Sequence, residues 1–410
     1  MSTRPFRFVH ASDFHLEQPL MGVADVPEHL RDLFLDAPYT AVKKLFEAVL
    51  AEDADFVVLS GDLLHPLGSG PRGTLFLMEQ FSRLAEREIG VYWAGGSVDP
   101  PEAWPAPLAL PQNVHVFPHG QVEQLTIQRA GEPLAHLAGL SRDRQRPLRP
   151  GDFAADPAGR YSIAVAHGDV DPSTLQTQGI HYWALGGRHD RSTLLGGPQT
   201  IHYCGSPQGR RPEESGVHGC TLVQVDPTCQ TRTSLIPTDA VRWLGERITI
   251  DETTTREELE TRLRDRLHAL LEASAATPLL ISWTVAGQGP LAGQLRRGML
   301  AGELREGLRS DYGYRSPAAW SVSLDVEVSE MLPPEWYEQE TIRGDFLRAI
   351  RQLQMNPEET LALDAYLAET HLAGTLAAAA VVAGKPARDR VLREAAMLGI
   401  DLLSGEEPQA

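Results

Sequence analysis

Cysteine is scarce in this chain, and the few cysteines present do not form a recognisable pair. Cys204, Cys220 and Cys229 are the three cysteines among 410 residues, and none has Cys-x-x-Cys spacing. This pattern is typical of free thiols in a reducing compartment and excludes a disulfide-rich secreted fold. The longest apolar stretch, around residues 376–383, falls far short of the roughly 20 residues that a membrane span needs. No signal-peptide segment follows Met-Ser-Thr-Arg-Pro at the start, so we predict a cytoplasmic protein without membrane attachment.

Basic residues are outnumbered by acidic ones. Lys and Arg total 37 against 55 Asp and Glu, which gives a net charge of −18. Because attraction to a polyanion needs a cationic surface, this balance argues against broad, non-specific nucleic-acid binding, although a local basic groove is compatible with it. With 42% hydrophobic and 22% charged residues, the composition is that of a globular protein. A chain of 410 residues is too long for one ordinary core, so two or three domains are expected.

The first 240 residues alternate short apolar runs with stretches of helical spacing. Helices are predicted over residues 30–51 and 75–86. Short strands are predicted at residues 6–11, 56–59, 91–94, 114–117, 134–138, 163–166, 181–185 and 222–225. Strands interleaved with helices, and then consecutive strands, indicate a layered α/β domain over residues 1–240.

A different pattern begins near residue 243. Thr255 and Glu258 have the spacing of a capping box, which predicts a helix start. The helix that follows carries four leucines on one face, namely Leu259, Leu263, Leu267 and Leu270. A strand over 279–285, a helix over 291–308 and an alternating strand over 321–329 follow. We predict a small α+β domain over residues 241–330.

Residues 331–410 are predicted to be helical. Phe346, Ile350 and Leu353 share one helix face, which fits either a core or a partner-binding stripe. Asn-Pro-Glu-Glu at residues 356–359 marks a second helix start.

Acidic and imidazole side chains follow the predicted strands at their ends. Asp13 and His15 come after the first strand, and Asp62 comes after the second. His167 and His189 follow two later strands. Carboxylates and imidazoles together suit manganese, iron or zinc better than calcium. Because two such ions a few ångströms apart catalyse phosphate-ester cleavage, the pattern predicts a metal centre for phosphate chemistry.

The ordered set of motifs resembles the calcineurin-like metallophosphoesterase superfamily and, more narrowly, the bacterial SbcD/YhaO-type DNA-repair nucleases. The matching stretches are residues 8–20, 55–65, 111–117, 182–186 and 203–210. The resemblance covers most of the chain and is specific in its first half. It implies a four-layer α/β/β/α metallophosphoesterase sandwich with a small α+β capping domain and a helical C-terminal segment.

The same resemblance implies two metal sites. Site one comprises Asp13, His15, Asp62 and His189, and all four residues are present. Site two comprises Asp62, an Asn, His167 and a second His. Site one therefore has its full set of ligands, whereas site two depends on the residues at two further positions.

The asparagine and the second histidine of site two, and the family's catalytic histidine, are all replaced in this chain. The family's Gly-Asn-His-Asp motif aligns with residues 96–99, where Ser97 replaces the Asn and Val98 replaces the catalytic His. Its Gly-His-x-His motif aligns with residues 186–189, where Gly187 replaces the second His. Valine cannot donate a proton, and general acid–base help is typically worth about 10²–10⁴ in rate. We expect one firmly bound ion, Ser97 and His167 as weak ligands of a second, and hydrolysis that is weak or lost.

Other polar residues are assigned by their position near these motifs. His65 matches a family position with His or Asp and is predicted either to approach the phosphate or to be a surface histidine. Arg188, Arg210 and Arg211 are predicted to bind phosphate. A further arginine cluster, at residues 142, 144, 146 and 149, is either a phosphate-contacting rim on the site face or a solvated loop, and the net charge favours the solvated loop.

Three functions are compatible with these features. The first is a manganese-dependent nuclease subunit of a DNA-repair complex, working with an SbcC-like coiled-coil ATPase that docks on the C-terminal helical segment. The second is a non-catalytic homologue that binds DNA ends or assembles with such an ATPase. The third is a phosphoesterase that uses one ion on another phosphate ester. The altered motifs favour the second over the first, the added domains favour either over the third, and the resemblance also implies a homodimer.

Overall fold

The computed structural model describes most of the chain. The described residues are 4–23, 26–66, 68, 70–105, 108–143, 147–327, 334–357, 361 and 384–403. The apolar stretch at 376–383, Arg144, Arg146 and residues 358–359 of the predicted helix start lie outside these ranges. By its internal contacts the chain divides into two compact units. One comprises residues 1–245, 271–281 and 314–319, and the other comprises 246–270, 282–313 and 320–410.

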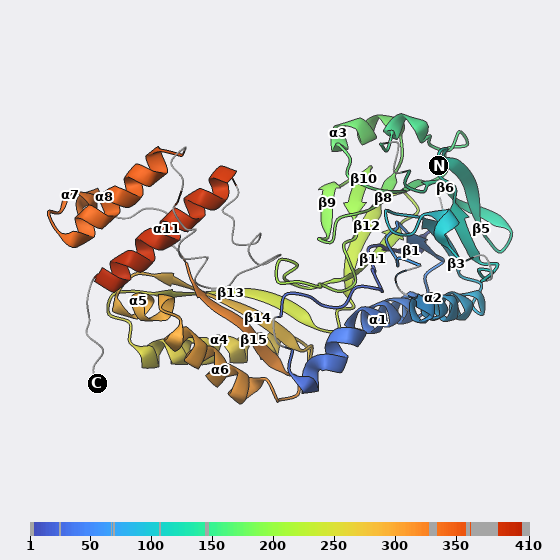
Figure 1. The fold of residues 1–410 in the computed structure, drawn as a ribbon. Helices are drawn as coiled ribbons and strands as arrows, with labels where there is room; N and C mark the ends of the chain where they lie inside the picture. Colours follow the sequence, from blue (N-terminus) through green and yellow to red (C-terminus); the bar gives the residue numbers. More distant parts are fainter. Residues whose placement is uncertain are drawn as a thin grey trace. The chain divides into compact units, whose positions relative to one another are not determined.

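Two six-stranded sheets form the body of the first unit (Figure 1). The first has the order β12 (Thr231–Pro237), β11 (Gly219–Val225), β1 (Phe6–Ala11), β2 (Phe56–Leu59), β3 (Gly90–Ala94) and β4 (Val114–Phe117). The second has the order β5 (Glu123–Arg129), β6 (Glu132–Leu140), β7 (Ser162–His167), β8 (Tyr182–Gly186), β10 (Thr200–Tyr203) and β9 (Ser192–Leu195). Strands β1 to β4 are parallel, as are β6, β7, β8 and β10. Their carboxyl ends therefore gather at one edge of each sheet, where the predicted site residues follow.

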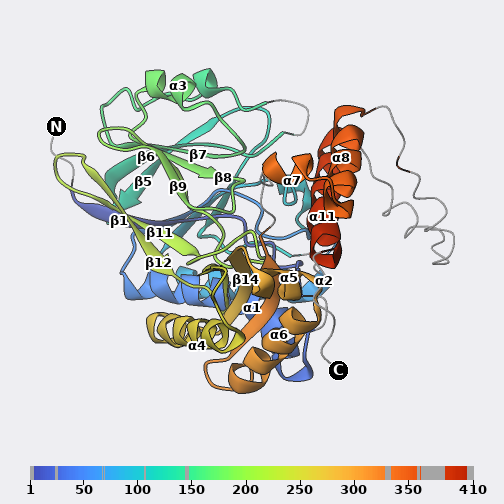
Figure 2. The same ribbon diagram turned by 90° about the vertical axis from the view of Figure 1, so that its left-hand side faces the viewer.

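The two sheets pack face to face and are covered by helices on their outer faces. Phe8 and Phe56 of the first sheet share a buried core with Ile163 and Tyr182 of the second. Helices α1 (Glu28–Ala51) and α2 (Gly70–Ala85) pack on the outer face of the first sheet through residues such as Phe46. The short helix α3 (Pro172–Leu175) lies on the other side (Figure 2). This order of layers is the predicted α/β/β/α sandwich.

The second unit contains the helices of the predicted α+β domain. Residues 242–326 form a three-stranded sheet of β13 (Arg242–Ile250), β14 (Leu279–Gly287) and β15 (Ala319–Val326). The capping box is confirmed, because Thr255 N–H donates to Glu258 Oε2 at 3.0 Å and Glu258 N–H donates to Thr255 Oγ1 at 3.3 Å. The helix it opens, α4 (Arg256–Ala273), buries all four predicted leucines. The single helix predicted over 291–308 is wrong: α5 (Pro290–Arg296) and α6 (Met299–Tyr312) are separated at Gly298, whose φ is +89°.

Helices α7 (Pro334–Glu338), α8 (Ile342–Met355) and α11 (Gly384–Leu403) follow. Leu347 and Ile350 of α8 pack against Leu392, Ala396 and Ile400 of α11. Phe346 and Leu353 are partly buried against the same cluster. Of the two interpretations of this face, the structure therefore supports a core. None of the helices within the described ranges combines the length and apolar character that crossing a membrane requires.

Candidate metal centre

Three acidic and imidazole side chains leave the first sheet in a strained backbone conformation. Asp13, His15 and Asp62 have φ values of +56°, +42° and +56°. Left-handed backbone is unfavourable for residues with a Cβ and persists where surrounding structure enforces it, often at functional sites. Here the two loops are tied together, because Asp13 N–H donates to Gly61 O at 2.9 Å and His15 N–H donates to Asp62 O at 3.1 Å. The ladder of β1 and β2 thus continues into the site and fixes where the three side chains point.

Asp13, His15 and His189 form a first group of possible metal ligands, with one ligand atom of each within 4.8 Å of the others. Asp13 Oδ1 and both ring nitrogens of His15 are buried without a hydrogen-bond partner among the described residues. Asp13 Oδ1 lies 3.9 Å from His15 Nε2, and Asp62 Oδ2 lies 3.7 Å from the same nitrogen. These separations are too long for hydrogen bonds, but they suit ligands of one ion about 2 Å from each. Buried polar atoms without partners are costly, so the residues of predicted site one fit a metal ion.

His189 is held in place by two charged neighbours. Its Nδ1 lies 2.9 Å from Glu214 Oε1, which orients the ring and leaves Nε2 for an ion, as carboxylates commonly do behind metal-binding histidines. Arg210 Nη2 lies 3.1 Å from both ring nitrogens. Burial tends to raise the pKa of Glu214, but its hydrogen bonds with His189, Arg210 N–H and Arg211 lower it to about 2. Glu214 was not identified from the sequence, because nothing in its spacing marks it as a partner of His189.

A second group combines Asp13, Asp62 and His167. His167 Nε2 lies 3.4 Å from Asp62 Oδ2, and its Nδ1 lies 2.8 Å from Ser60 O, which accepts the Nδ1 proton. Burial would lower the pKa of His167, but the hydrogen bond and charge of Asp62 raise it to about 9. The same contact lowers the pKa of Asp62 against the effect of its own burial. The sequence predicted that only Asp62 and His167 remain at site two; the structure adds Asp13 as a third candidate ligand and a second carboxylate beside them.

The altered motif binds Asp62 through its backbone. The N–H groups of Ser97 and Val98 both donate to Asp62 Oδ1, the latter at 3.0 Å. The side chain of Ser97 faces elsewhere, since its Oγ accepts a hydrogen bond from Arg142 Nη1 at 2.6 Å. One oxygen of Asp62 is thus engaged by N–H groups, which leaves Oδ2 between His15 and His167.

Gly187, at the other altered position, shapes the site through its backbone. Its N–H donates to Asp13 Oδ2 at 3.0 Å, and its φ is +100°. A Cβ at this position would lie 3.2 Å from His167 Nε2 and would be strained by the left-handed backbone. The local conformation therefore fits glycine.

Asp99, the last residue of the altered motif at residues 96–99, is buried and accepts several hydrogen bonds. Its carboxylate accepts from the N–H groups of Asp62, Leu63 and Gly96, and from the indole of Trp93 at 3.2 Å. Burial and the nearby charge of Asp62 raise the pKa of Asp99 to about 7, while the N–H donors act in the opposite direction. A single buried carboxyl group thus connects the loops after β2 and β3.

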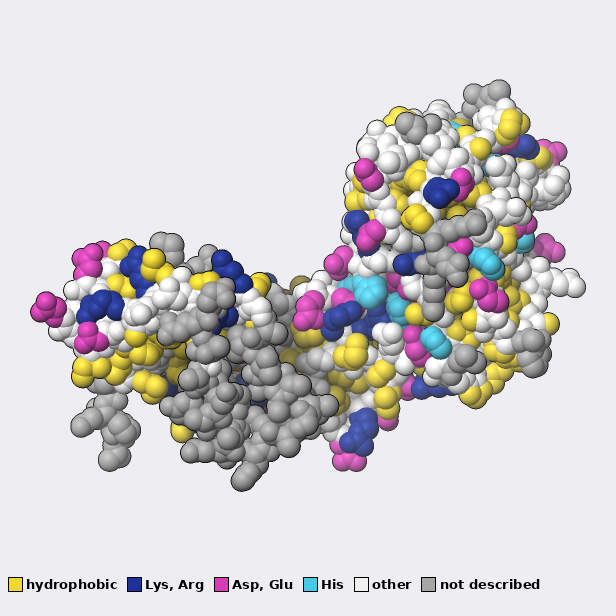
Figure 3. Space-filling view, turned by 45° about the horizontal axis from the view of Figure 1, so that its top comes forward, with side chains coloured by type: hydrophobic (Ala, Val, Ile, Leu, Met, Phe, Trp, Pro, Cys, Tyr) yellow, Lys and Arg dark blue, Asp and Glu magenta, His cyan; other side chains and the backbone are white. Residues whose placement is uncertain are grey.

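The other predicted site residues lie around the two groups. His65 is exposed; its N–H donates to Glu17 Oε2 at 2.9 Å, and its Nδ1 accepts from Gly68 N–H. Arg188 pairs with Asp169 at 2.7 Å and lies over the Tyr203 ring, whereas Arg211 bonds Glu214 at 3.0 Å. The side chain of Arg210 is only 3% exposed. In Figure 3, histidine, basic and acidic side chains gather on one face of the molecule.

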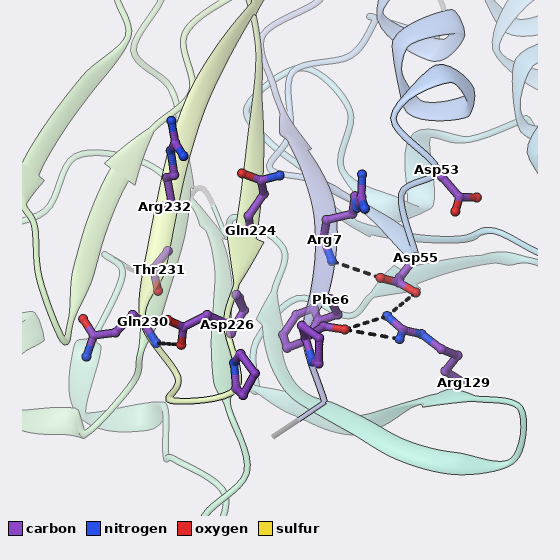
Figure 4. A pocket seen from close by; sticks show the side chains of 13 residues that line it. Phe6, Arg7, Asp53, Asp55, Arg129, Gln224, Asp226, Gln230, Thr231 and Arg232 are labelled. Carbon is purple, nitrogen blue, oxygen red and sulfur yellow. Dashed lines mark hydrogen bonds and ion pairs between the residues drawn. The ribbon is translucent and has the colours of Figure 1, made fainter. Parts of the chain in front are cut away.

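A cavity of about 660 Å³ lies beside the first residues of β1, at the end of the strand opposite to the candidate ligands (Figure 4). Its charged groups are largely engaged already: Asp55 accepts from Arg7 N–H at 2.9 Å and pairs with Arg129 at 2.5 Å. It contains none of the predicted site residues. Size therefore does not identify the chemically competent site in this unit.

Comparison with known proteins agrees with the geometry. Residues 6–190 match the family model of calcineurin-like phosphoesterases, and residues 243–329 match the model of the middle domain of metallophosphoesterase YhaO. The uncharacterized metallophosphoesterase YhaO of Bacillus subtilis is 29% identical over 232 residues, which are 53% of this chain and 57% of that protein. The match thus spans little more than half the length of this relative.

Solved structures resemble the chain at low identity. A dimetal phosphatase from Danio rerio is 10% identical, with 56% of this chain and 98% of that one covered and a TM-score of 0.35. Vacuolar protein sorting 29 from Cryptosporidium parvum is 14% identical, with 58% and 99% covered and a TM-score of 0.26. The Zn²⁺ complex of Vps29 from Entamoeba histolytica is 13% identical, with 57% and 99% covered and the same TM-score of 0.26.

Proposed function

Since the chain joins a calcineurin-like metallophosphoesterase domain to a YhaO-type middle domain, we propose that it is an SbcD/YhaO-type protein that binds one divalent ion firmly and hydrolyses phosphodiesters slowly. The observation that carries this proposal is the pair of buried, unpartnered atoms Asp13 Oδ1 and His15 Nε2, 3.9 Å apart. A metal ion satisfies both atoms at once. His189, fixed by Glu214, and Asp62 complete its surroundings.

The candidate site contains residues that would hold the ion, but its side chains provide no proton donor at the family's position. Asp13, His15, His189 and Asp62 would hold the ion, which when bound polarises a phosphate oxygen and acidifies a water molecule. The leaving oxygen needs a proton, and Val98 occupies the position from which the family's histidine assists it. The side chain of Val98 cannot supply one, which supports slow turnover.

DNA is the proposed substrate, and it rests on the resemblance to the repair nucleases. Arg188 and Arg211, at the edge of the site, offer guanidinium groups to a phosphate backbone. The mixture of carboxylate and imidazole ligands favours manganese, with iron or zinc as alternatives. Assembly with an SbcC-like coiled-coil ATPase and formation of a homodimer belong to the same proposal.

A second candidate function is a non-catalytic subunit that binds DNA ends within such a complex. The observation that favours it is again the motif at residues 96–99, in which two backbone N–H groups bind Asp62 and no imidazole is present. Metal binding at the first group is common to both candidates, so only a rate measurement separates them.

The test is manganese-dependent hydrolysis of bis(p-nitrophenyl) phosphate and of linear duplex DNA. Asp62→Ala is the inactive control, and Asp32→Ala, on the exposed face of α1, is the matched substitution. We expect slow hydrolysis that Asp62→Ala abolishes and Asp32→Ala leaves unchanged, with bound metal measured by mass spectrometry. Equal inertness of all three proteins with metal bound supports the non-catalytic subunit. Failure to bind any divalent ion contradicts both candidates, and cleavage of the small ester without DNA excludes the DNA substrate.

A further inference from the structure

The second ligand group lacks part of the ligand set that would hold the second ion of a two-ion site. It retains Asp13, Asp62 and His167, while Ser97 and Gly187 supply no carboxylate or imidazole. One oxygen of Asp62 is engaged by the N–H groups of Ser97 and Val98. A transferring phosphate carries negative charge that two ions normally neutralise from both sides. Some other cation is therefore needed beside this group if a phosphate is to bind there.

Arg142 is a cation whose backbone is held beside the loop that carries Ser97. Its backbone N–H donates to Gly95 O at 2.8 Å, and Gly95 N–H donates to the Oγ of Ser141 at 2.7 Å. These bonds tie the residue after β6 to the loop that carries Ser97. The guanidinium then donates to Ser97 Oγ at 2.6 Å through Nη1. The guanidinium group of Arg142 therefore contacts Ser97, the residue that replaces the family's metal-binding asparagine.

A small cavity joins this arginine to the second ligand group. Its volume is about 60 Å³, and its wall includes Arg142, Arg149 and His167. One water needs roughly 10–15 Å³ of such space, so the cavity has room for several waters or for one tetrahedral oxyanion. Asp143 and Asp152 also line it, so the wall is not uniformly basic. Two arginines and two aspartates carry no net charge together, so an anion in this cavity would depend on hydrogen bonds from the guanidinium groups.

The donors suit a phosphate. Guanidinium groups present N–H donors in a planar fork that matches two oxygens of a phosphate. Among the described residues, Arg142 uses its fork only for Ser97, and the exposed side chain of Arg149 makes no hydrogen bond or ion pair. Asp152 is also exposed and lies on the turn over Pro150–Asp152, which begins directly after Arg149. The earlier interpretation of this cluster as a solvated loop does not account for the contact of Arg142 with Ser97.

We propose that this cavity is a phosphate-oxyanion subsite in which Arg142 and Arg149 supply the positive charge that the altered second metal site lacks. Its ligand is a phosphate oxygen of the substrate, or inorganic phosphate as the product analogue. The inference rests on the proposed phosphoesterase function for its biological meaning, but phosphate binding is measurable without turnover.

The experiment is calorimetric titration of the full chain with inorganic phosphate, with and without manganese. The variants are Arg142→Gln, Arg142→Lys and Arg149→Gln, and the matched control is Arg87→Gln, on an exposed turn after α2. We expect Arg142→Gln to weaken phosphate binding about tenfold or more, because it removes a charge-assisted contact. Arg149→Gln should weaken it less, and Arg142→Lys should retain part of it. Metal content and the phosphate affinity of Arg87→Gln should equal those of the parent chain.

The outcomes separate the two proposals. Equal phosphate affinity in Arg142→Gln and Arg87→Gln overturns the subsite, whether or not the protein hydrolyses any ester. No phosphate binding by the parent chain also overturns it. Weakened binding in Arg142→Gln together with no metal-dependent hydrolysis by the parent chain supports the subsite and contradicts only the catalytic function. If hydrolysis is measurable, Arg142→Gln should raise KM more than it lowers kcat, because the phosphate is held less tightly.

Discussion

Val98 is the single residue whose side chain most limits the expected rate. Its N–H binds Asp62 Oδ1 at 3.0 Å, and this backbone contact does not depend on the side chain. Val98→His should therefore restore an imidazole without removing the contact. We expect phosphodiester hydrolysis to rise by about tenfold or more, below the full 10²–10⁴ because the ring is not positioned by evolved neighbours.

The measurement is the initial rate with bis(p-nitrophenyl) phosphate at saturating manganese, and Val98→Leu is the control for side-chain size. No gain in Val98→His, with metal content equal to that of the parent chain, would show that the missing imidazole is not what limits the reaction.

Glu214 is predicted to govern metal affinity although it is not one of the candidate ligands. It fixes His189 through Nδ1 at 2.9 Å and also binds Arg211 at 3.0 Å. Loss of such an outer carboxylate typically lowers metal affinity 10–100-fold. Glu214→Gln should therefore bind manganese about tenfold or more weakly in a calorimetric titration, whereas Glu213→Gln, at the exposed neighbouring position, should not differ from the parent chain. Equal affinity in both variants contradicts this role.

The same carboxylate makes stability depend on pH. The pKa of Glu214 is about 2, below its ordinary value of 4.5. A depressed pKa means that the charged form stabilises the folded state above pH 4.5, and this contribution is lost as the pH falls from 4.5 toward 2. Its full size is about 3 kcal/mol. In urea unfolding of the metal-free chain, the advantage of the parent over Glu214→Gln should shrink between pH 6 and pH 3; a constant difference would contradict the argument.

At the scale of elements, the sequence predicted strands with continuous apolar runs better than strands that contain several polar residues. β2 has the predicted bounds, because Phe56–Leu59 is apolar throughout. β5, β9 and β12 were not predicted, since in these strands polar residues alternate with partly buried ones and the ladder with neighbouring strands stabilises them. Such pairing depends on tertiary contacts that periodicity does not contain.

The candidate metal ligands could also be predicted from the sequence, but most of the residues around them could not. Asp13, His15, Asp62, His167 and His189 were identified because each follows a strand in a recognisable motif, and the structure gathers all of them. Glu214 and Asp99 were not assigned roles, since each acts through a contact with a residue distant in the sequence. Arg142 was predicted only as a member of an arginine cluster, and its contact with Ser97 was not predicted. The sequence therefore indicates the ligands, while the groups that orient and supplement them require the fold.

The pairing of α8 with α11 is a prediction about one element of the second unit. Leu347 is 0% exposed in the cluster it shares with Leu392 and Ile400 of α11. Leu347→Ala should cost about 2–5 kcal/mol of local stability, because it removes buried methyl groups and leaves a cavity. Amide hydrogen exchange should accelerate in both helices, and Ile342→Ala, which is 75% exposed in the parent chain, should leave exchange unchanged. Unchanged exchange in Leu347→Ala contradicts the packing.

The charge of the whole molecule limits how it can bind DNA. A net charge of −18 provides no general attraction to a polyanion. Only local cations near the site remain, of which Arg142, Arg149, Arg188 and Arg211 lie within the described residues. If these four make all the phosphate contacts, the slope of log affinity against log salt concentration is no steeper than about −4, since each contact on duplex DNA contributes roughly −0.9.

Fluorescence anisotropy of a labelled duplex end across a salt series tests this limit. We expect a shallow slope, and Arg188→Gln should reduce its magnitude by about one, because one phosphate contact is removed. Arg87→Gln should leave the slope unchanged. A slope steeper than about −6 would mean that a basic surface away from the metal centre carries DNA binding. In that case the acidic balance of the chain as a whole would be a poor guide to its DNA-binding face, and the cations beside the second ligand group would serve the reacting phosphate alone.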